Sequence, residues 1–416
     1  MSKDNMNTPA ENTRPAPSRS DERLRVAIAG CGVIGRTHAA VVRELPDLMV
    51  TALIDEVVEA AEALASSIEA QGARRPETFR ALSAALAGAP VDLVIIATPS
   101  GLHIQQALEV LAAGKHVVIE KPLDVDLSRA NEILSAAEAA EAKGLVASVI
   151  SQHRFDPASR AVDVARRAGR FGTLTSAIAS VSWWRSQAYY DSGAWRGTWA
   201  MDGGGAVMNQ GVHTVDLLLW FLGRPVEISA KTALLAHDGV EVEDTAVATV
   251  TFDSGALAVL HATTAAYPGL TVRLQLMGST GSAVIDGDQL EYFHAADAGS
   301  GGSDMGLLGA GNQAADELAK FPDEEVQALD PTVYPAGHVR QYRDIVDAIR
   351  AGRPAGVTVR DAVTALATVR GLYVSATLGL PVLIDEVLAG RYDHVDVRTG
   401  GSRPADSADA LEEASA

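Results

Sequence analysis

The stretch that decides the fold, RVAIAGCGVIG, occupies residues 25–35. A short apolar segment precedes three glycines with the spacing G-x-G-x-x-G, which is typical of a strand, turn and helix that bind a dinucleotide. In this interpretation Gly30 makes the tight turn, Gly32 lets the backbone approach a pyrophosphate, and Gly35 lets the helix pack closely on the strand. The N-terminus of the helix then faces the phosphates. The residues expected to hold the cofactor here are Gly30, Gly32, Val33, Ile34 and Gly35.

An acidic residue follows the next apolar segment. Residues 48–54 read LMVTALI and lead into Asp55, which lies 20 positions after Gly35. A carboxylate at about this distance accepts hydrogen bonds from the adenosine ribose of a bound dinucleotide. Glu56 beside it is unfavourable for a 2′-phosphate, and no Arg or Lys directly follows, so the sequence favours NAD over NADP. The alternative is a buried strand followed by an ordinary turn aspartate.

Charge and cysteine content exclude several classes of protein. The 416 residues contain 53 acidic and 34 basic side chains, a net charge of −19, and no run of positive charge. Nucleic acid and membrane surfaces are therefore not expected partners. The single cysteine, Cys31, excludes an intrachain disulfide framework and a cysteine-based metal cluster. The first twenty residues lack an apolar core and no apolar run is long enough to span a bilayer, so a cytoplasmic protein is expected.

The pattern of apolar segments predicts two domains between two disordered tails. Residues 1–22 and 398–416 are expected to be disordered. Residues 23–146 alternate strand and helix, which predicts a doubly wound parallel sheet with a helix at 78–86. Residues 147–397 contain longer strands with period-two alternation, which predict a mostly antiparallel sheet in an α+β domain. One long helix, at about 206–222, interrupts those strands, and 295–335 is expected to be a long loop.

Two further strands of the first domain end in polar residues. The apolar segment 91–97 ends at Thr98-Pro99, and residues 116–119 end at Glu120-Lys121-Pro122. In a doubly wound sheet the ligand lies beyond the carboxyl ends of the strands, so both ends are expected to line the cofactor site. For Thr98 and Pro99 a plain strand-ending turn is the alternative.

Lys121 is the candidate for proton transfer. Partial burial beside an oxidised nicotinamide would disfavour its ammonium and lower its pKa toward the working pH. The side chain could then accept or return a hydroxyl proton while hydride moves to or from the cofactor. Glu120 favours the charged form, and a structural Lys–Glu pair is the alternative.

The predicted helix at 206–222 places three polar residues on one face. Asn209, His213 and Asp216 are four and three positions apart, and they follow three glycines that allow close approach of a ligand. His213 titrates near neutrality and can share proton transfer with Lys121. A satisfied structural histidine is the alternative. A metal site is not expected, because no third ligand follows at a fixed spacing.

Aromatic and basic residues gather before this helix. Such a mixture suits a polyhydroxylated ring that carries an anionic group, although it would equally suit a protein interface. The members are His153, Arg154, Trp183, Trp184, Arg185, Tyr189, Tyr190, Trp195 and Arg196. Substrate binding is expected of Arg154, Arg185, Tyr190, Trp195 and Asp216.

Four motifs together resemble the Gfo/Idh/MocA oxidoreductases, the family of glucose–fructose oxidoreductase and the inositol dehydrogenases. They are Gly30-x-Gly32-x-x-Gly35, Thr98-Pro99-x-x-x-His103, Glu120-Lys121-Pro122 and Asn209-x-x-x-His213-x-x-Asp216. The resemblance extends from about residue 23 to 395. It implies a Rossmann domain, a second domain with a large open sheet, assembly as a homodimer or homotetramer, and NAD(P)-dependent chemistry on a sugar or cyclitol hydroxyl. It also places His103 and Glu120 at the cofactor.

The resemblance matches Lys121 and His213 to the catalytic lysine and histidine of the family. Asn209 occupies a position where inositol-dehydrogenase-like members have an aspartate, and an amide does not relay a proton. The proton relay is therefore expected to use Lys121 and His213. Two other functions stay open: an NAD-dependent glycosidase of the same superfamily, and a non-catalytic regulator that binds a dinucleotide.

Overall fold

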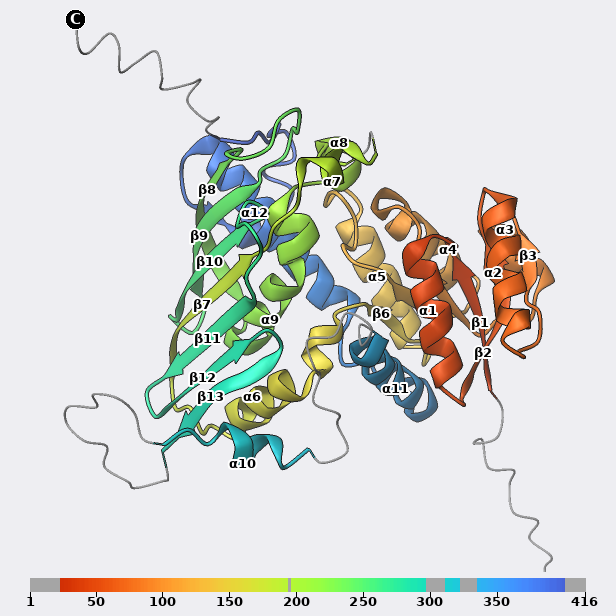
Figure 1. Ribbon diagram of the computed structural model, residues 1–416, viewed down its shortest axis with the longest axis horizontal. Coiled ribbons are helices and arrows are strands. Elements are labelled where there is room, and N and C mark those ends of the chain that lie inside the picture. Colours follow the sequence, from red (N-terminus) through yellow and green to blue (C-terminus); the bar gives the residue numbers. More distant parts are fainter. Residues whose placement is uncertain (1–22, 194–195, 297–310, 322–334, 401–416) are drawn as a thin grey trace, which may run out of the picture.

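The computed structural model describes residues 23–193, 196–296, 311–321 and 335–400. They form two domains that lie side by side, each built on one β-sheet (Figure 1). In the described residues no helix combines the length and the apolar character that crossing a membrane requires.

The first domain is a six-stranded parallel sheet with the order β3-β2-β1-β4-β5-β6. Its strands are β1 (Leu24–Ala29), β2 (Leu48–Ile54), β3 (Glu77–Phe79), β4 (Leu93–Ile96), β5 (His116–Ile119) and β6 (Ala147–Val149). Its helices are α1 (Val33–Glu44), α2 (Val58–Ala70), α3 (Leu82–Gly88), α4 (His103–Ala112) and α5 (Ala130–Glu141). The strand order reverses between β1 and β4, which opens a crevice at the carboxyl ends of these strands.

Burial explains why the strands of this sheet read as continuous apolar runs. Residues 26–29 of β1 and 93–96 of β4 have no exposed surface, because helices cover both faces of the sheet. The predicted parallel sheet is confirmed. The helix predicted at 78–86 is partly wrong, since residues 77–79 pair with β2 as an edge strand and the helix begins at Leu82.

The second domain is an eight-stranded sheet with the order β13-β12-β11-β7-β10-β9-β8-β14. Its strands are β7 (Leu174–Ser182), β8 (Pro225–Ala233), β9 (Thr245–Phe252), β10 (Leu257–Thr263), β11 (Val272–Gly278), β12 (Gly281–Asp286), β13 (Gln289–Ala295) and β14 (Val382–Leu383). All neighbouring strands are antiparallel except β7 and β10. The predicted mostly antiparallel sheet is therefore confirmed.

Helices cover one face of this sheet and leave the other open (Figure 1). The helices of the second half are α6 (Pro157–Arg167), α7 (Gln187–Asp191), α8 (Trp199–Asp202), α9 (Val212–Leu222), α10 (Ala314–Leu318), α11 (Pro335–Ala351), α12 (Val359–Leu378) and α13 (Ile384–Leu388). Short 3₁₀ turns are η1 (Ser100–Leu102) and η2 (Gln152–Phe155), and η3 (Ala206–Gly211) is a π-helix. The long helix predicted at 206–222 is thus a π-helical segment followed by α9.

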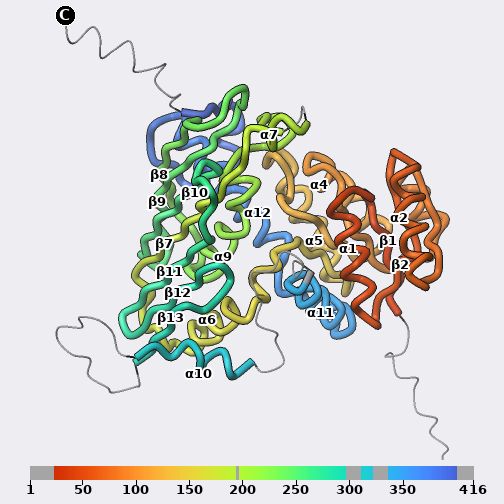
Figure 2. The backbone as a smooth tube through the Cα atoms, viewed as in Figure 1, coloured from red at the N-terminus to blue at the C-terminus, as the bar shows by residue number. Residues whose placement is uncertain are grey.

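The chain returns to the first domain near its end. Helix α11 lies against α1, although about 300 residues separate them in the sequence (Figure 2). Tyr342, Ile345 and Val346 belong to the same buried cluster as Val26 and Ile28 of β1. The first domain therefore includes residues beyond the predicted boundary at 146/147. Strand β6 belongs to its sheet, and helix α11 packs against its helix α1.

Candidate active site

The glycine turn has the shape that its spacing predicts. Gly30 has a φ of +93°, and a Cβ atom there would lie 2.3 Å from the carbonyl oxygen of Ala97. A Cβ on Gly35 would lie 1.9 Å from the carbonyl oxygen of Gly30, so α1 packs on the turn with no room for a side chain. A Cβ on Gly32 would meet nothing within 4 Å, which leaves open space for a pyrophosphate beside the start of α1.

Asp55 is tied to this turn. Its Oδ2 accepts a hydrogen bond of 2.8 Å from the amide of Cys31, and its Oδ1 accepts one of 2.9 Å from the amide of Val57. The carboxylate therefore lies at the end of β2 beside the glycines, where a ribose would bind. Burial and the charge of Asp55 raise the pKa of the Cys31 thiol to about 12, so this cysteine is an inert filler.

His103 connects the two loops that follow β4 and β5. Its Nδ1 lies 2.8 Å from the carbonyl oxygen of Pro122 and its Nε2 lies 2.9 Å from that of Thr98. The ring is buried, which lowers its pKa. Thr98 in turn donates from Oγ1 to Gln106 at 2.8 Å. These bonds hold the Thr98-Pro99 loop beside Pro122 at the carboxyl ends of β4 and β5. The buried His103 ring therefore positions both loops.

Glu120 is the centre of a buried network that the sequence patterns did not reveal. Its Oε1 lies 2.9 Å from Nε2 of His38, and its Oε2 accepts from the amide of Lys121 at 2.9 Å. The Tyr342 hydroxyl lies 3.0 Å from the other nitrogen of His38, and His338 lies 3.9 Å from Glu120. Burial opposes ionisation, but the two histidines outweigh it and hold the pKa of Glu120 well below its usual range. The network links β5 to α1 and α11.

Lys121 extends from the end of β5 toward the second domain. Its Nζ lies 3.4 Å from the carbonyl oxygen of Asn209 in η3. Burial lowers the pKa of this lysine, while the charge of Glu120 opposes that shift. The direction agrees with the prediction that desolvation lowers the pKa of this lysine toward the working pH, so its neutral amine forms more readily than that of a surface lysine.

His213 of α9 lies in the same region as Lys121. The two side chains line one small cavity of about 30 Å³, together with Pro122, Val149 and Asp216. Burial lowers the pKa of His213 well below its ordinary value, and the charges of Lys121 and His153 add to the shift. The imidazole is therefore neutral at neutral pH and can accept a hydrogen bond.

The segment that carries Asn209 is held by a buried acid. The carboxylate of Glu243 accepts hydrogen bonds of 2.9 Å from the amides of Gly205 and Val207 and from the hydroxyl of Tyr373. Burial raises the pKa of Glu243 to about 7. Asn209 donates from Nδ2 to the carbonyl oxygen of Gly204 at 3.0 Å. The π-helical turn, a feature common at functional sites, is thereby fixed against the sheet.

Arg154 forms an ion pair with Asp216, which lines the cavity. The guanidinium donates to both carboxylate oxygens, at 2.7 Å from Nε and 2.5 Å from the terminal nitrogen, and both side chains are buried. Ser151 also donates to Asp216, and Asp361 lies 3.5 Å from Arg154. The charges of the two residues predicted to bind substrate compensate each other, so in this structure they brace η2 against α9.

The remaining predicted substrate residues lie farther along the second domain. Arg185 stacks between Trp183 and Tyr189, with its guanidinium carbon 5.0 and 5.3 Å from the ring centroids. The Tyr190 hydroxyl lies 2.9 Å from Thr264, and burial raises its pKa to about 12. Trp195 lies outside the described residues.

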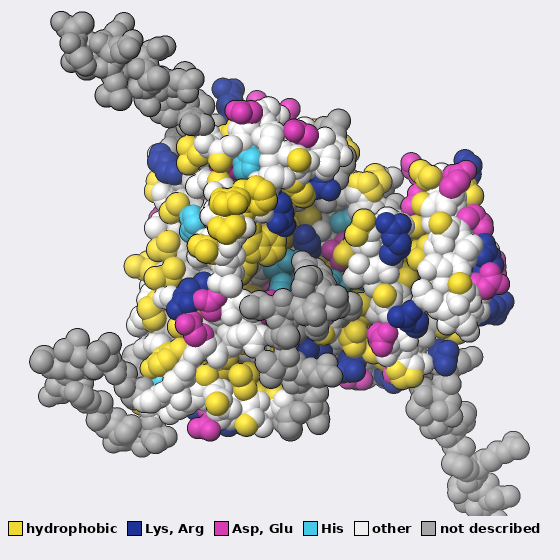
Figure 3. Space-filling view, in the orientation of Figure 1, with side chains coloured by type: hydrophobic (Ala, Val, Ile, Leu, Met, Phe, Trp, Pro, Cys, Tyr) yellow, Lys and Arg dark blue, Asp and Glu magenta, His cyan; other side chains and the backbone are white. Residues whose placement is uncertain are grey.

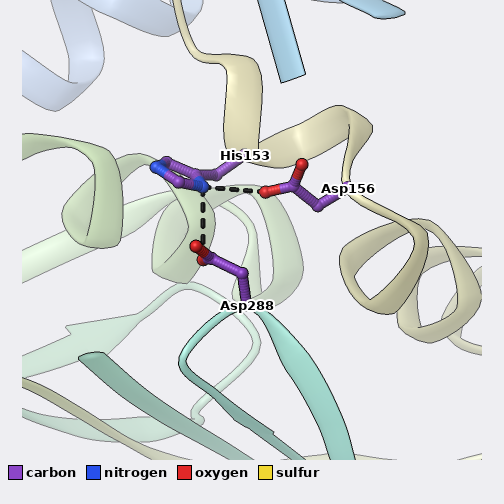
Figure 4. A group of neighbouring side chains, drawn as sticks. All are labelled: His153, Asp156 and Asp288. Carbon is purple, nitrogen blue, oxygen red and sulfur yellow. Dashed lines mark hydrogen bonds and ion pairs between the residues drawn. The ribbon is translucent and has the colours of Figure 1, made fainter. Parts of the chain in front are cut away.

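A histidine of η2 completes the surroundings of His213. The rings of His153 and His213 meet edge to face with centroids 5.3 Å apart. His153 in turn lies against Asp156 and Asp288 (Figure 4). In the space-filling view, histidine side chains are visible in the hollow between the two domains, beside basic side chains (Figure 3).

Comparison with known families agrees with the two-domain fold. Residues 24–149 match a family described as "Oxidoreductase family, NAD-binding Rossmann fold", and residues 160–284 match "GFO/IDH/MocA C-terminal domain". Among curated proteins, inositol 2-dehydrogenase of Rhizobium meliloti is 28% identical over 268 residues, which are 63% of this chain and 76% of that protein. The predicted NAD cofactor is confirmed at the level of the domain that binds it.

Solved structures give the same result over more of the chain. The WlbA dehydrogenase of Bordetella pertussis, in complex with NADH and UDP-GlcNAcA, is 30% identical with a TM-score of 0.73 and covers 87% of this chain and 98% of its own. GenD2 from gentamicin A biosynthesis, in complex with NAD, is 28% identical with a TM-score of 0.68 and covers 89% and 99%.

Proposed function

Since this chain belongs to the GFO/IDH/MocA family of NAD-dependent oxidoreductases, we propose that it transfers hydride between NAD and a secondary hydroxyl or carbonyl group of a sugar, a sugar derivative or a cyclitol. The observation that carries the proposal is the meeting of Lys121 and His213, which come from different domains and line one cavity. That cavity lies beyond the carboxyl end of β5, on the side where a doubly wound sheet binds its ligand.

The glycine turn and the two strand-end loops suit the cofactor. Gly32 and the N-terminus of α1 would hold the pyrophosphate, Asp55 the adenosine ribose, and Thr98 and Pro99 the wall near the nicotinamide. His103 and Glu120 would act indirectly. His103 positions the loops at Thr98 and Pro122, and Glu120 positions Lys121. When bound, NAD supplies the acceptor or donor of a hydride.

The protein supplies the proton transfer. In the direction of oxidation, Lys121 in its neutral form accepts the proton of the reacting hydroxyl, and burial is what makes that form accessible. His213, neutral because burial disfavours its cation, accepts a hydrogen bond from the same group or shares the proton. Asn209 has no titratable group and positions Lys121 through its backbone carbonyl. In reduction the same residues return the proton.

The substrate class follows from the aromatic and basic side chains of the second domain and from the relatives. Stacked aromatic and arginine side chains such as Trp183, Arg185 and Tyr189 suit a sugar ring with polar or anionic substituents. The relatives include an inositol dehydrogenase and a structure solved with UDP-GlcNAcA. A sugar or sugar nucleotide is therefore the first class to test, with cyclitols second.

The test is a substrate screen with NAD. Purified protein is incubated with NAD and a panel of sugars, inositols and sugar nucleotides, and NADH formation is followed by its absorbance. Formation of NADH with at least one panel member, lost in Lys121→Ala, supports the proposal. Release of sugar from a glycoside without net NADH would favour a glycosidase. Binding of NAD without turnover of any compound would favour a regulator.

We also propose that the open face of the second sheet joins two copies of the chain. Ile178, Val247, Leu257 and Val259 are each at least two-fifths exposed and lie on this face of β7, β9 and β10. Val259 pairs with Ile178 in the strand register, so the apolar side chains are contiguous. An exposed apolar sheet face of this kind is typical of a subunit interface, in a homodimer or homotetramer.

A further inference from the structure

One cluster of charged groups beside the active site has no role in the proton transfer described above. It consists of His153 of η2, Asp156 at the start of α6, and Asp288 in the turn between β12 and β13. Nδ1 of His153 lies 2.8 Å from Oδ2 of Asp156 and 3.2 Å from Oδ1 of Asp288. Both carboxylates therefore face the same ring nitrogen.

The turn that carries Asp288 is built to project it. Gly287 and Asp288 have φ angles of +54° and +63°, which is the conformation of a two-residue turn between antiparallel strands. Asp288 is the one described residue other than glycine with a positive φ. Aspartate tolerates this conformation better than most side chains. The hairpin at the edge of the sheet thus places a carboxylate against His153, beside the active site.

The geometry indicates a shared proton rather than a metal ion. Ligands of a tetrahedral ion lie about 2.0–2.1 Å from it and hence more than 3 Å from one another, whereas Nδ1 of His153 lies only 2.8 Å from Asp156. The second oxygen of Asp156 is also occupied, by Arg340 at 2.6 Å. A protonated imidazole that donates to carboxylates satisfies all these contacts.

The charges around His153 favour its cation. Asp156 and Asp288 raise the pKa of His153 well above its ordinary value, although burial opposes them. Among the residues that the structure describes, Arg340 and His213 are the other titratable or charged groups that face this cluster; Arg340 balances Asp156, and His213 stays neutral. The cluster is therefore close to neutral as a whole, with a fixed positive ring at its centre.

The other nitrogen of this ring is available for a ligand. To the described residues, every side-chain hydrogen bond and ion pair of His153 is made by Nδ1. Nε2 points away from both carboxylates (Figure 4). The ring of His153 meets the ring of His213 edge to face, with centroids 5.3 Å apart. A substrate oxygen beside His213 would therefore lie near the imidazole of His153.

We propose that His153 binds the substrate as an imidazolium, donating from Nε2 to an oxygen next to the reacting carbon, and that Asp156 and Asp288 hold it in that state. This inference rests on the proposed oxidoreductase function and extends it with a substrate-binding residue and two positioning residues. A neutral oxygen, such as the hydroxyl next to the one oxidised, is the expected partner, because an anion would lie close to two carboxylates. The substrate class is then a vicinal diol in a sugar or cyclitol ring.

The first experiment measures the protonation of His153 without any turnover. Histidine side-chain signals of the NAD-bound protein are titrated by NMR, and the His153 signal is assigned from its loss in His153→Gln. In the parent protein His153 is expected to stay protonated well above pH 6.5. Asp288→Asn removes one of the two charges and is expected to lower its midpoint by about one unit.

Asp286→Asn is the matched control. Asp286 lies in the same hairpin and pairs with Arg273 rather than with His153. The control variant is expected to leave the His153 midpoint unchanged. A midpoint that Asp288→Asn does not move, or that Asp286→Asn moves as far, would overturn the role of Asp288.

The second experiment measures substrate binding. With the panel compound that is turned over, His153→Gln is expected to raise KM about tenfold or more with a smaller effect on kcat, because it removes a charged donor. Asp288→Asn is expected to raise KM mainly at high pH, where His153 then loses its proton. An unchanged KM in His153→Gln would refute the binding role. If no compound is turned over, the proposed function and this binding role fail together, while the titration still decides how His153 is held.

Discussion

Nζ of Lys121 lies 3.4 Å from the carbonyl oxygen of Asn209, four residues before His213, so the end of β5 in one domain touches the helix that carries the histidine of the other. The two titratable side chains consequently line the same cavity. Both domains therefore contribute to the active site, and a substitution of Lys121 or of His213 should affect the same proton transfer.

Replacement of Lys121 should affect catalysis and spare cofactor binding. We expect Lys121→Ala to lower kcat about a hundred- to ten-thousand-fold, the usual range for loss of a positioned proton acceptor. The Kd for NAD, measured by fluorescence titration, should change little. Lys115→Ala serves as the control, because Lys115 precedes the opposite end of the same strand. Near-normal turnover in Lys121→Ala would contradict the assigned role.

The pH dependence of oxidation should follow the two shifted groups. Burial lowers the pKa of Lys121, so the proton-accepting amine forms below the ordinary lysine value of 10.5, and the rate should rise and level off at a pKa below that value. His213 becomes charged only well below 6.5, so its effect should be a second, steeper fall of kcat/KM on acidification, below pH 6.5. A limb near 6.5 that disappears in His213→Gln would show that this histidine is not shifted.

Asp55 should determine the affinity for the adenosine ribose. We expect Asp55→Ser to weaken NAD binding about tenfold or more, since a charged acceptor of hydrogen bonds is lost, and to narrow the preference for NAD over NADP. Glu56→Gln changes the neighbouring acid and should weaken NAD binding much less. Calorimetric titration with both cofactors makes the comparison. Tighter binding of NADP than of NAD by the parent protein would overturn the predicted preference.

The pair of Arg154 and Asp216 should contribute more to stability than to substrate affinity. Arg154→Met leaves the buried carboxylate of Asp216 without its partner and is expected to cost about 3–5 kcal/mol of unfolding free energy. Arg129→Met removes an exposed pair with Glu132 and should lower the free energy of unfolding much less. Chemical denaturation measures both. A stable Arg154→Met protein with a raised KM would instead support direct substrate binding.

Charges on the open sheet face should separate subunits. We expect Val259→Asp to shift the protein to a smaller species in sedimentation velocity, because it places a carboxylate among the apolar side chains of this face. Val164→Asp is the control, since Val164 is exposed on α6, in the layer that covers the opposite face. A parent protein that sediments as a monomer, or a Val259→Asp protein of unchanged size, would contradict the proposed interface.

Local patterns in the sequence predicted the parts of the site that are contiguous in the chain. The glycine spacing, the acid after β2 and the polar residues after β4 and β5 are each set by a strand and its turn. The structure places Asp55 beside the glycine turn and Gly30 against the end of β4, while the binding roles of these residues stay predictions. The strands of the second sheet were also predictable, because one face is covered and period-two alternation follows.

Contacts between distant segments were not predictable in this way. Nothing near Glu120 in the sequence indicates that His338 and Tyr342, more than 200 residues later, lie around it through α11. The hairpin that projects Asp288 toward His153 was missed for the same reason. Arg154 and Asp216 were predicted as ligands of a substrate, but their partners are each other, which only the packing of η2 against α9 reveals.

The joint action of Lys121 and His213 is tested most directly by a crystal structure of the protein with NAD bound. The arrangement of the glycine turn, the strand-end loops and the shared cavity predicts the nicotinamide ring beside both side chains, with Lys121 and His213 facing the same edge of the ring. A nicotinamide that lies beside only one of them, or outside the crevice between the domains, would contradict the proposed mechanism.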